Sequence, residues 1–225
     1  MPIPSLAFLI DVDNTLLDND RAKADEAAYL RRLVGEEPAS RFWEIYEQVR
    51  REEDVVDYPL TLARFEKAFA GQLAKETLAQ LAMYLVSFPF HEYLYPGALE
   101  TLKYLGGLGT TAITSDGDAS FQGLKIVRSG VSASVDGRVV LYLHKEQHLD
   151  EIMALFPARH YVVVDDKARV LSAQKAQMGA LCTTVHVRQG KYAKVPQAPG
   201  ELPPDLSVAA ISDMQHLSPA QLGGS

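Results

Sequence analysis

The chain contains a single cysteine, Cys182, so no disulfide can form within it. Stability must therefore come from a hydrophobic core, and 225 residues suffice for a substantial core with one inserted module. No apolar stretch approaches the length needed to span a bilayer, and no basic region precedes the short apolar run at the amino terminus. We expect a cytoplasmic protein without a signal peptide and without a membrane partner.

An excess of basic charge is absent as well. The chain has 22 lysine and arginine residues against 29 aspartate and glutamate residues, which gives a net charge of −7. This balance offers no electrostatic reason to expect nucleic acid as a partner. Hydrophobic residues make up 47% of the chain, which disfavours disorder. The composition is that of a compact enzyme, and it leaves the oligomeric state open.

What the sequence does contain is an apolar run that ends in two aspartates. Leu6–Asp18 has the sequence L-A-F-L-I-D-V-D-N-T-L-L-D. Unbroken apolar character over the length of a strand is typical of a strand buried on both faces of a parallel sheet. Such sheets bind ligands beyond the carboxyl ends of their strands, which is where Asp11 and Asp13 are placed. Aspartate is also common there as a turn former or helix cap, so this segment alone leaves both interpretations open.

Other segments favour the functional interpretation, because each is a strand-like stretch that ends in polar or charged residues. They are Gly109–Asp118 with Ser115, Val139–Lys145 with its terminal lysine, and His160–Lys167 with Asp165 and Asp166. In a parallel sheet the carboxyl ends of these strands lie at one edge. We therefore expect these residues to converge there, although they are far apart in the sequence.

The charge at that edge indicates a metal. Asp11, Asp13, Asp165 and Asp166 would bring four carboxylates close together, and repulsion would protonate some of them unless a cation held them. Mg²⁺ prefers hard oxygen ligands and combines one or two carboxylates with water and a phosphate oxygen. The residues thus predict a magnesium-bearing phosphate site, in which Lys145 and the hydroxyl group of Ser115 face the remaining phosphate oxygens.

These segments resemble the four sequence motifs of the haloacid dehalogenase superfamily, specifically of its phosphatase branch. The motifs are D-V-D-N-T at residues 11–15, Ser115 after the next strand, Lys145 after the following one, and the D-D pair at residues 165–166. Their order agrees, with about thirty residues from Ser115 to Lys145 and about twenty more to Asp166. The resemblance covers the core, roughly Pro4–Leu17 and Phe90–Leu217.

The resemblance implies an α/β fold with a doubly wound, Rossmann-like parallel sheet and an inserted α-helical cap. The alternation of strand and helix patterns after Phe90 also predicts the doubly wound core. The inserted segment is rich in residues that favour helices, with apolar positions three and four apart and breaks near Gly35–Pro38, Tyr58–Pro59 and Gly71–Thr77. We assign residues 1–17 and 90–217 to the core, 18–89 to the cap, and 218–225 to a tail with a frayed end.

The resemblance also implies a role for each motif residue. Asp11 corresponds to the nucleophile that becomes an aspartyl-phosphate, and Asp13 to the general acid and base. Ser115 and Lys145 correspond to the hydroxyl group and the cation that bind the transferring phosphoryl group. These roles suit phosphoryl transfer, which depends on positioning and on neutralising the charge of the phosphoryl oxygens.

The metal in that family is Mg²⁺. Asp166 corresponds to its acidic ligand and Asp165 to a supporting ligand, with Asp11 and the backbone carbonyl of Asp13 as further ligands. A general acid needs a raised pKa near neutral pH, and we expect the nearby anions to raise the pKa of Asp13. A dehalogenase of this superfamily has no need for the second aspartate, so Asp13 favours phosphate esters over carbon–halogen bonds.

One motif departs from the common pattern. The sequence S-D-G places Asp116 where the family more often has asparagine or serine, and an extra carboxylate beside a phosphate is unfavourable unless it points away or supports the fold. We expect Asp116 to belong to the phosphate-binding site together with Ser115 and Lys145. A shift of one residue would make Thr114 the functional hydroxyl; we prefer Ser115, because this alignment keeps the glycine of the motif in place.

Two patterns in the cap have ordinary interpretations. Phe42, Trp43 and Tyr46 lie at near-helical spacing, which favours core packing over stacking on a substrate. The charge run at residues 50–54 favours a solvated helix face. One arginine of that run, or Arg64, would be available to an anionic substrate if it faced the site.

We expect a magnesium-dependent phosphatase that acts on a small phosphorylated metabolite through an aspartyl-phosphate. A mobile cap would close over the site, exclude water and select the substrate. A phosphomutase using the same intermediate is one alternative, and a non-catalytic phosphate-binding regulatory protein is another. The sequence does not identify the phosphomonoester.

Overall fold

The computed structural model describes residues 3–54, 56–117 and 120–224, and it contains a six-stranded sheet in the order β3-β2-β1-β4-β5-β6. Every neighbouring pair of strands is parallel. The strands are β1 Leu6–Ile10, β2 Thr110–Asp116, β3 Val139–Tyr142, β4 His160–Asp165, β5 Cys182–Val187 and β6 Leu206–Val208. The predicted doubly wound α/β fold is thus confirmed.

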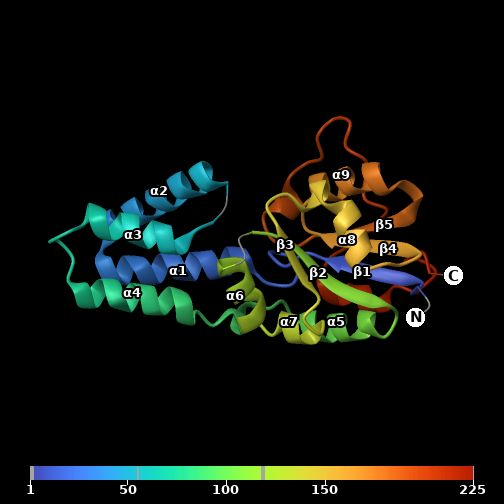
Figure 1. Cartoon of the computed structure of the whole chain (residues 1–225), viewed down its shortest axis with the longest axis horizontal. Helices are drawn as coiled ribbons and strands as arrows, with labels where there is room; N and C mark the ends of the chain where they lie inside the picture. The colour runs from blue at the N-terminus through green and yellow to red at the C-terminus, as the bar shows by residue number, and fades with distance from the viewer. Residues whose placement is uncertain (1–2, 55, 118–119, 225) are drawn as a thin grey trace.

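The central strand β1 is buried on both faces, as its unbroken apolar sequence predicts. Leu6, Phe8 and Ile10 pack in one hydrophobic cluster, whereas Ala7 and Leu9 pack in the other. Helices α8 and α9 cover one face, and α5 and α7 cover the other (Figure 1). The core helices are α5 Ala98–Gly106, α6 Phe121–Arg128, α7 Val131–Ser134, α8 Leu149–Leu155 and α9 Ala168–Met178.

Four helices between β1 and β2 form a separate bundle, called here the four-helix unit, which lies beyond the carboxyl ends of the strands (Figure 1). They are α1 Asn19–Val34, α2 Glu36–Glu53, α3 Tyr58–Ala68 and α4 Lys75–Ser87. The unit has its own apolar core, which includes Phe42 and Phe65. Two helices begin at aspartate caps, because the side chains of Asp18 and Asp57 accept hydrogen bonds from backbone N–H groups of the first turn. No helix of the described residues is both long and apolar enough to cross a bilayer.

Two chain segments join the four-helix unit to the core, and they are hydrogen-bonded to each other. The backbone N–H of Asp18 donates to the carbonyl of Tyr93 at 2.8 Å, and that of Tyr95 donates to the carbonyl of Leu16 at 2.9 Å. Leu17 and Leu94 form an antiparallel bridge between these bonds. We call this element the paired connection.

The remaining short elements are 3₁₀ turns. They are η1 Phe90–Tyr93, η2 Lys145–Gln147, η3 Gly179–Leu181, η4 Tyr192–Lys194 and η5 Ile211–His216. The predicted strand Val139–Lys145 is shorter than expected, since β3 ends at Tyr142 and Lys145 begins η2. Asp118, the last residue of the predicted segment Gly109–Asp118, lies outside the described residues.

Fraying was expected at Gly223–Ser225, but the backbone N–H groups of Gly223 and Gly224 are hydrogen-bonded, and Ser225 lies outside the described residues. Leu222 is fully buried and belongs to the same hydrophobic cluster as Phe8. Backbone N–H groups of residues 222–224 donate to carbonyls of residues 218–220, which closes a compact turn. The sequence S-P-A-Q-L-G-G gives no periodic signal, so the single apolar anchor was not recognisable as a core residue.

Candidate active site

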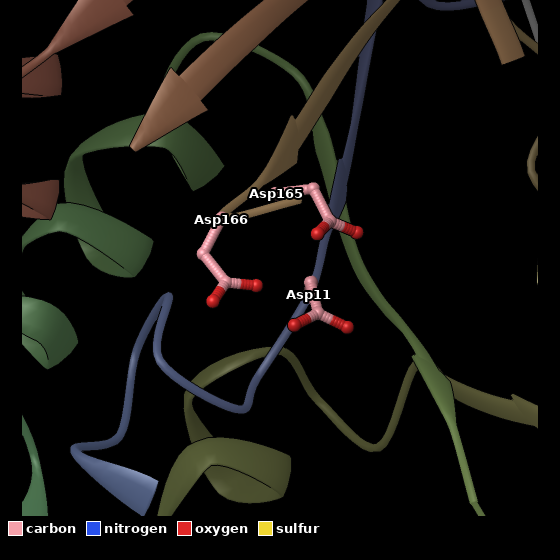
Figure 2. Close-up of side chains that lie close together, drawn as sticks. All are labelled: Asp11, Asp165 and Asp166. Carbon is pink, nitrogen blue, oxygen red and sulfur yellow. The ribbon is translucent and has the colours of Figure 1, made fainter. Parts of the chain in front are cut away.

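Three buried carboxylates meet at the carboxyl edge of the sheet. Asp11 follows β1, Asp165 ends β4 and Asp166 comes next, and β1 and β4 are neighbours in the sheet. One carboxylate oxygen from each residue lies within 4.8 Å of the others. Figure 2 shows the three side chains pointing toward one another. Parallel pairing of β1 with β4 thus produces the predicted convergence for these residues.

Lys145 is placed in the middle of this edge. Its Nζ lies 2.7 Å from Asp11 Oδ1 and 2.6 Å from Asp165 Oδ2, and it donates to the carbonyl of Thr114 at 3.1 Å. The side chain is 1% exposed. Burial lowers the pKa of Lys145, but the negative charges of Asp11 and Asp165 raise it by more. The pKa therefore lies above its ordinary value, and the ammonium group stays charged.

The pKa values of the three carboxyl groups diverge. Burial, and then the charge of Asp165, raises the pKa of Asp11 to about 6 despite the opposing effect of Lys145. Burial, Asp165 and Asp11 raise the pKa of Asp166 to about 8. Burial also opposes ionisation of Asp165, but Lys145 and Lys167 outweigh it, so the pKa of Asp165 lies below its ordinary value. The group therefore holds a proton at neutral pH that a cation would displace.

The donor set fits a divalent cation. Asp11 Oδ2 and both oxygens of Asp166 are buried and accept no hydrogen bond from the described residues. Buried carboxylate oxygens without partners are costly, and oxygen ligands of this kind suit Mg²⁺. Asp165 is more engaged, since its Oδ1 accepts from the backbone N–H of Lys167 at 2.8 Å and its Oδ2 faces Lys145. Asp11 and Asp166 are thus the freer ligands, and Asp165 supports them.

The hydroxyl group beside Asp11 belongs to Ser115. Ser115 Oγ lies 3.5 Å from Asp11 Oδ1 and accepts a hydrogen bond from Gln122 Nε2 at 3.0 Å. Thr114 contributes its carbonyl to Lys145 instead, and its own hydroxyl is buried without a partner. The geometry favours Ser115 over Thr114. Gln122, on α6, was missed in the sequence analysis, because a glutamine on a helix carries no motif.

Asp116 supports the fold of the site. Its Oδ1 accepts a hydrogen bond from the backbone N–H of Lys145 at 2.9 Å. Its negative charge also raises the pKa of Lys145. The contact fixes the turn that presents Lys145, and binding of phosphate by Asp116 stays a prediction.

Asp13 lies apart from the three carboxylates and is paired with Lys125. Lys125 Nζ donates to Asp13 Oδ1 at 2.8 Å, to Asp13 Oδ2 at 3.0 Å and to Asn19 Oδ1 at 3.1 Å. Burial raises the pKa of Asp13, but Lys125 outweighs it, so the pKa lies below its ordinary value. The expectation of a raised pKa is therefore wrong. A metal contact through the backbone carbonyl of Asp13 stays a prediction.

Lys125 was also missed in the sequence analysis. It lies on α6, is 4% exposed, and its Nζ sits 5.9 Å from the centroid of the Phe90 ring. Lys125 follows Gln122 by three residues, so the two side chains lie on the same side of the short helix α6. This spacing is the sequence signal that could have identified Lys125. A lysine in such a helix is usually solvated, so its burial depends on the presence of Asp13 and is not evident from the helix alone.

A cavity of about 600 Å³ lies between the sheet edge and the four-helix unit. Asp13, Asp116 and Lys167 line it from the core, and Trp43 and Tyr46 line it from α2. Tyr46 is also packed in the core of the four-helix unit, so the predicted packing role is confirmed for it without excluding contact with a ligand. The site thus has a charged end and an aromatic end.

Comparison with known proteins agrees with this geometry. Residues 6–176 match the family model of haloacid dehalogenase-like hydrolases. A solved structure from Burkholderia xenovorans LB400, described as a haloacid dehalogenase-like hydrolase, is 42% identical, covers 97% of this chain and 99% of that chain, and has a TM-score of 0.85. No curated protein matches the sequence.

More distant structures share the fold alone. The HAD-hydrolase YfnB from Bacillus subtilis, bound to magnesium, is 15% identical with a TM-score of 0.61, over 95% of this chain and 98% of that one. L-2-haloacid dehalogenase from Xanthobacter autotrophicus is 19% identical with a TM-score of 0.58, over 94% of this chain and 97% of that one. The fold is therefore compatible with more than one hydrolytic chemistry.

Proposed function

Since this chain belongs to the haloacid dehalogenase-like hydrolase family, we propose that it is a magnesium-dependent phosphatase that hydrolyses a small phosphomonoester through Asp11. One observation carries the proposal: Asp11 belongs to a carboxylate cluster suited to a divalent cation, its Oδ1 contacts the ammonium group of Lys145, and its Oδ2 is buried without a hydrogen-bond partner. That arrangement suits a nucleophile that attacks a negatively charged phosphoryl group.

The residues of the chain divide the work of the first step. One carboxylate oxygen of Asp11 attacks phosphorus while the bond from phosphorus to the leaving oxygen breaks, and the other oxygen is left for the metal. Mg²⁺ held by Asp11, Asp165 and Asp166 would neutralise charge on the phosphoryl oxygens. Lys145 and the hydroxyl of Ser115 bind other phosphoryl oxygens, and both already lie within 3.5 Å of Asp11 Oδ1. The product of this step is an aspartyl-phosphate at Asp11.

Asp13 handles the protons of both steps. It gives a proton to the leaving oxygen in the first step and takes one from the attacking water in the second, which releases inorganic phosphate and restores Asp11. In the free protein Lys125 keeps Asp13 ionised, which is the form required of a base. A bound phosphate dianion adds negative charge beside Asp13 and raises its pKa, which favours the acid form for the first step.

Displacement of a halide from carbon makes different demands. That reaction has no phosphoryl oxygens to neutralise, so it has no use for Asp166, whose two oxygens are buried without hydrogen-bond partners. It also has no alkoxide leaving group for Asp13 to protonate. The presence of both residues supports the phosphatase over the dehalogenase.

The test is phosphate release from a panel of phosphomonoesters, measured with Mg²⁺ and with chelator, for the native protein and for Asp11→Asn. We expect turnover that depends on Mg²⁺ and falls by at least about 10³-fold in Asp11→Asn, because the nucleophile is lost. Halide release from 2-haloacids is measured in parallel.

Halide release without phosphate release would overturn the proposal in favour of a dehalogenase. Turnover that requires a bisphosphate activator and releases little phosphate would indicate a phosphomutase. Phosphate binding with no turnover of any substrate would indicate a regulatory binding protein.

A further inference from the structure

Helix α2 presents two different faces. Its apolar residues Phe42, Ile45 and Val49 pack in the core of the four-helix unit. A second row is spaced three and four residues apart, so it lies along one side of the helix. That row consists of Trp43, Tyr46 and Arg50, and all of them line the cavity in front of Asp13.

Donors that are unpaired or only partly paired gather on this wall of the cavity. Lys23 Nζ, from α1, donates to the hydroxyl oxygen of Tyr46 at 2.9 Å, and no carboxylate of the described residues lies within 4.0 Å of it. Trp43 Nε1 is buried without a hydrogen-bond partner. The hydroxyl hydrogen of Tyr46 also has no acceptor among the hydrogen bonds of the described residues. We call Lys23, Trp43 and Tyr46 the donor group.

The acidic residues near the donor group already have partners. Glu26 accepts a hydrogen bond from Tyr58 at 2.8 Å, and Asp13 is held by Lys125. The acids farther along the wall pair with basic residues: Glu47 with Arg50 at 3.5 Å and Asp54 with His144 at 3.0 Å. Lys23 lies close enough to Asp13 and Glu26 to favour their ionised forms, but no acidic side chain of the described residues forms an ion pair with the donor group.

The cavity lining has five basic residues and four acidic residues, so its charge balance is slightly positive, whereas the whole chain has a net charge of −7. Its basic lining residues are Lys23, Arg50, Lys167, Arg169 and Lys191. A half-buried ammonium group and two neutral N–H and O–H donors without acceptors are unfavourable in the absence of a ligand. A negatively charged group with several oxygens would satisfy all of them together.

We propose that the donor group binds a second oxyanion, a carboxylate or a further phosphate, on the leaving group of the substrate. This proposal rests on the proposed phosphatase function, because it takes the first phosphate to be held at Asp11. A molecule bound there extends past Asp13 into the cavity, and about 600 Å³ suits a small metabolite. The substrate class is therefore a phosphomonoester with an anionic leaving group.

The test uses three probes with one carbon skeleton: glycerol 3-phosphate, 3-phosphoglycerate and glycerol 1,3-bisphosphate. The first has a neutral leaving group, the second adds a carboxylate, and the third adds a phosphate. We expect kcat/KM to be at least about tenfold higher for one of the two anionic probes, because a charged hydrogen bond has that effect on affinity. The better of the two identifies the oxyanion.

The variant Lys23→Met removes the charge and keeps the length of the side chain. We expect it to raise KM for the preferred anionic probe by at least about tenfold while changing kcat/KM for glycerol 3-phosphate by less than about threefold. Lys23→Arg should restore most of the loss, and Lys67→Met, on the exposed side of α3, is the control. Equal losses for all three probes, or no loss, would overturn the proposal.

A binding measurement keeps the two proposals distinguishable. Trp43 is the single tryptophan of the chain, so its fluorescence reports on this wall alone. In Asp11→Asn, titration with 3-phosphoglycerate or glycerol 1,3-bisphosphate should change this fluorescence at a concentration at least about tenfold lower than glycerol 3-phosphate does. Lys23→Met should abolish the difference.

If 4-nitrophenyl phosphate and all three probes yield no phosphate, the phosphatase proposal fails. The fluorescence difference then decides the oxyanion site by itself, and equal titration curves for all three probes would reject it.

Discussion

The sheet edge and the four-helix unit accommodate their charged groups in opposite ways. At the sheet edge the side chains of Lys145, Asp11 and Asp165 are at most 2% exposed. Lys145 Nζ lies 2.7 Å from Asp11 Oδ1 and 2.6 Å from Asp165 Oδ2. In the four-helix unit an ion pair such as Arg41–Glu44 has side chains that are 50% and 63% exposed. Buried charges depend strongly on their partners, whereas exposed pairs contribute little.

This contrast separates chemistry from selection. Parallel pairing fixes the positions of β1, β2 and β4, so the groups that would act on a phosphoryl group are held by rigid strands. The four-helix unit has an apolar core of its own and meets the site through residues of α1, including Asn19 and Lys23, and through one side of α2. A substitution at the sheet edge should therefore cost stability and activity, and one on the cavity-facing or outer side of the helices should change the substrate preference or have little effect.

The sharpest test of the contrast is Lys145→Met. It leaves Asp11 and Asp165 buried without their cation, so we expect the free energy of unfolding to fall by about 3 kcal/mol and activity to be lost. Urea denaturation measures the first effect and phosphate release the second. Lys103→Met on α5, where the lysine is exposed, is the matched control. A free energy of unfolding equal to that of the native protein would show that the ion pairs of Lys145 with Asp11 and Asp165 do not stabilise the fold.

Lys125→Met tests a buried cation that joins the two regions. Lys125 holds Asp13 of the core and Asn19 at the start of α1. Its loss should lower kcat by about 10- to 100-fold, because Asp13 is no longer positioned, while KM changes less. The pH profile should also move, since the pKa of Asp13 rises without Lys125. An unchanged profile would contradict this positioning role.

The pH dependence of Mg²⁺ binding tests the carboxylate group. Because the pKa of Asp166 is raised to about 8 in the metal-free protein, Mg²⁺ must displace a proton below that pH. Calorimetry should find that the apparent Kd for Mg²⁺ falls by up to about tenfold per unit as the pH rises toward 8, and then levels off. Asp166→Asn should weaken binding and remove this dependence. A Kd that is constant between pH 6 and 8 would contradict the raised pKa.

The same carboxylates set a pH trend for stability. The folded-state pKa values of Asp11 and Asp166 lie above those of an unfolded chain, so the folded state binds more protons between about pH 4 and 8. Without Mg²⁺, the free energy of unfolding should therefore fall as the pH rises through that window. Saturating Mg²⁺ should reverse most of the loss in a thermal denaturation experiment.

The smallest effect is expected on the outer face of the helices. Arg41→Ala removes the exposed pair with Glu44, and we expect a change in the free energy of unfolding within about 0.5 kcal/mol. Phe65→Ala on the buried side of α3 should instead cost about 3 kcal/mol or more, because it opens a cavity in the core of the four-helix unit. Equal effects of the two substitutions in urea denaturation would remove the distinction between its faces.

The sequence was sufficient where residues follow buried strands. Asp11, Ser115 and the Asp165–Asp166 pair come directly at strand ends, so strand pattern and parallel topology were enough to bring them together. Lys145 was also identified, although two residues separate it from the end of β3. The breaks between the helices of the four-helix unit were also predictable, from the positions of glycine and proline.

Residues on helices were harder to predict, because their partners come from distant segments. The burial of Lys125 depends on Asp13, which is 112 residues away in the sequence. Trp43 and Phe42 are adjacent in the sequence, yet only Phe42 is fully buried, since α3 packs on one side of α2 and the cavity lies on the other. Such choices between faces are made by tertiary packing rather than by the helix pattern.

The paired connection determines how the two halves of the molecule can move. Two strands joined by hydrogen bonds form a flat ribbon, which flexes across its thin dimension more readily than within its plane. We therefore expect the helices to rotate relative to the sheet most easily about an axis near Leu17 and Leu94. Leu17 is fully buried in the main core cluster, so a glycine at the less buried Leu94 would loosen this axis at a smaller cost to the core.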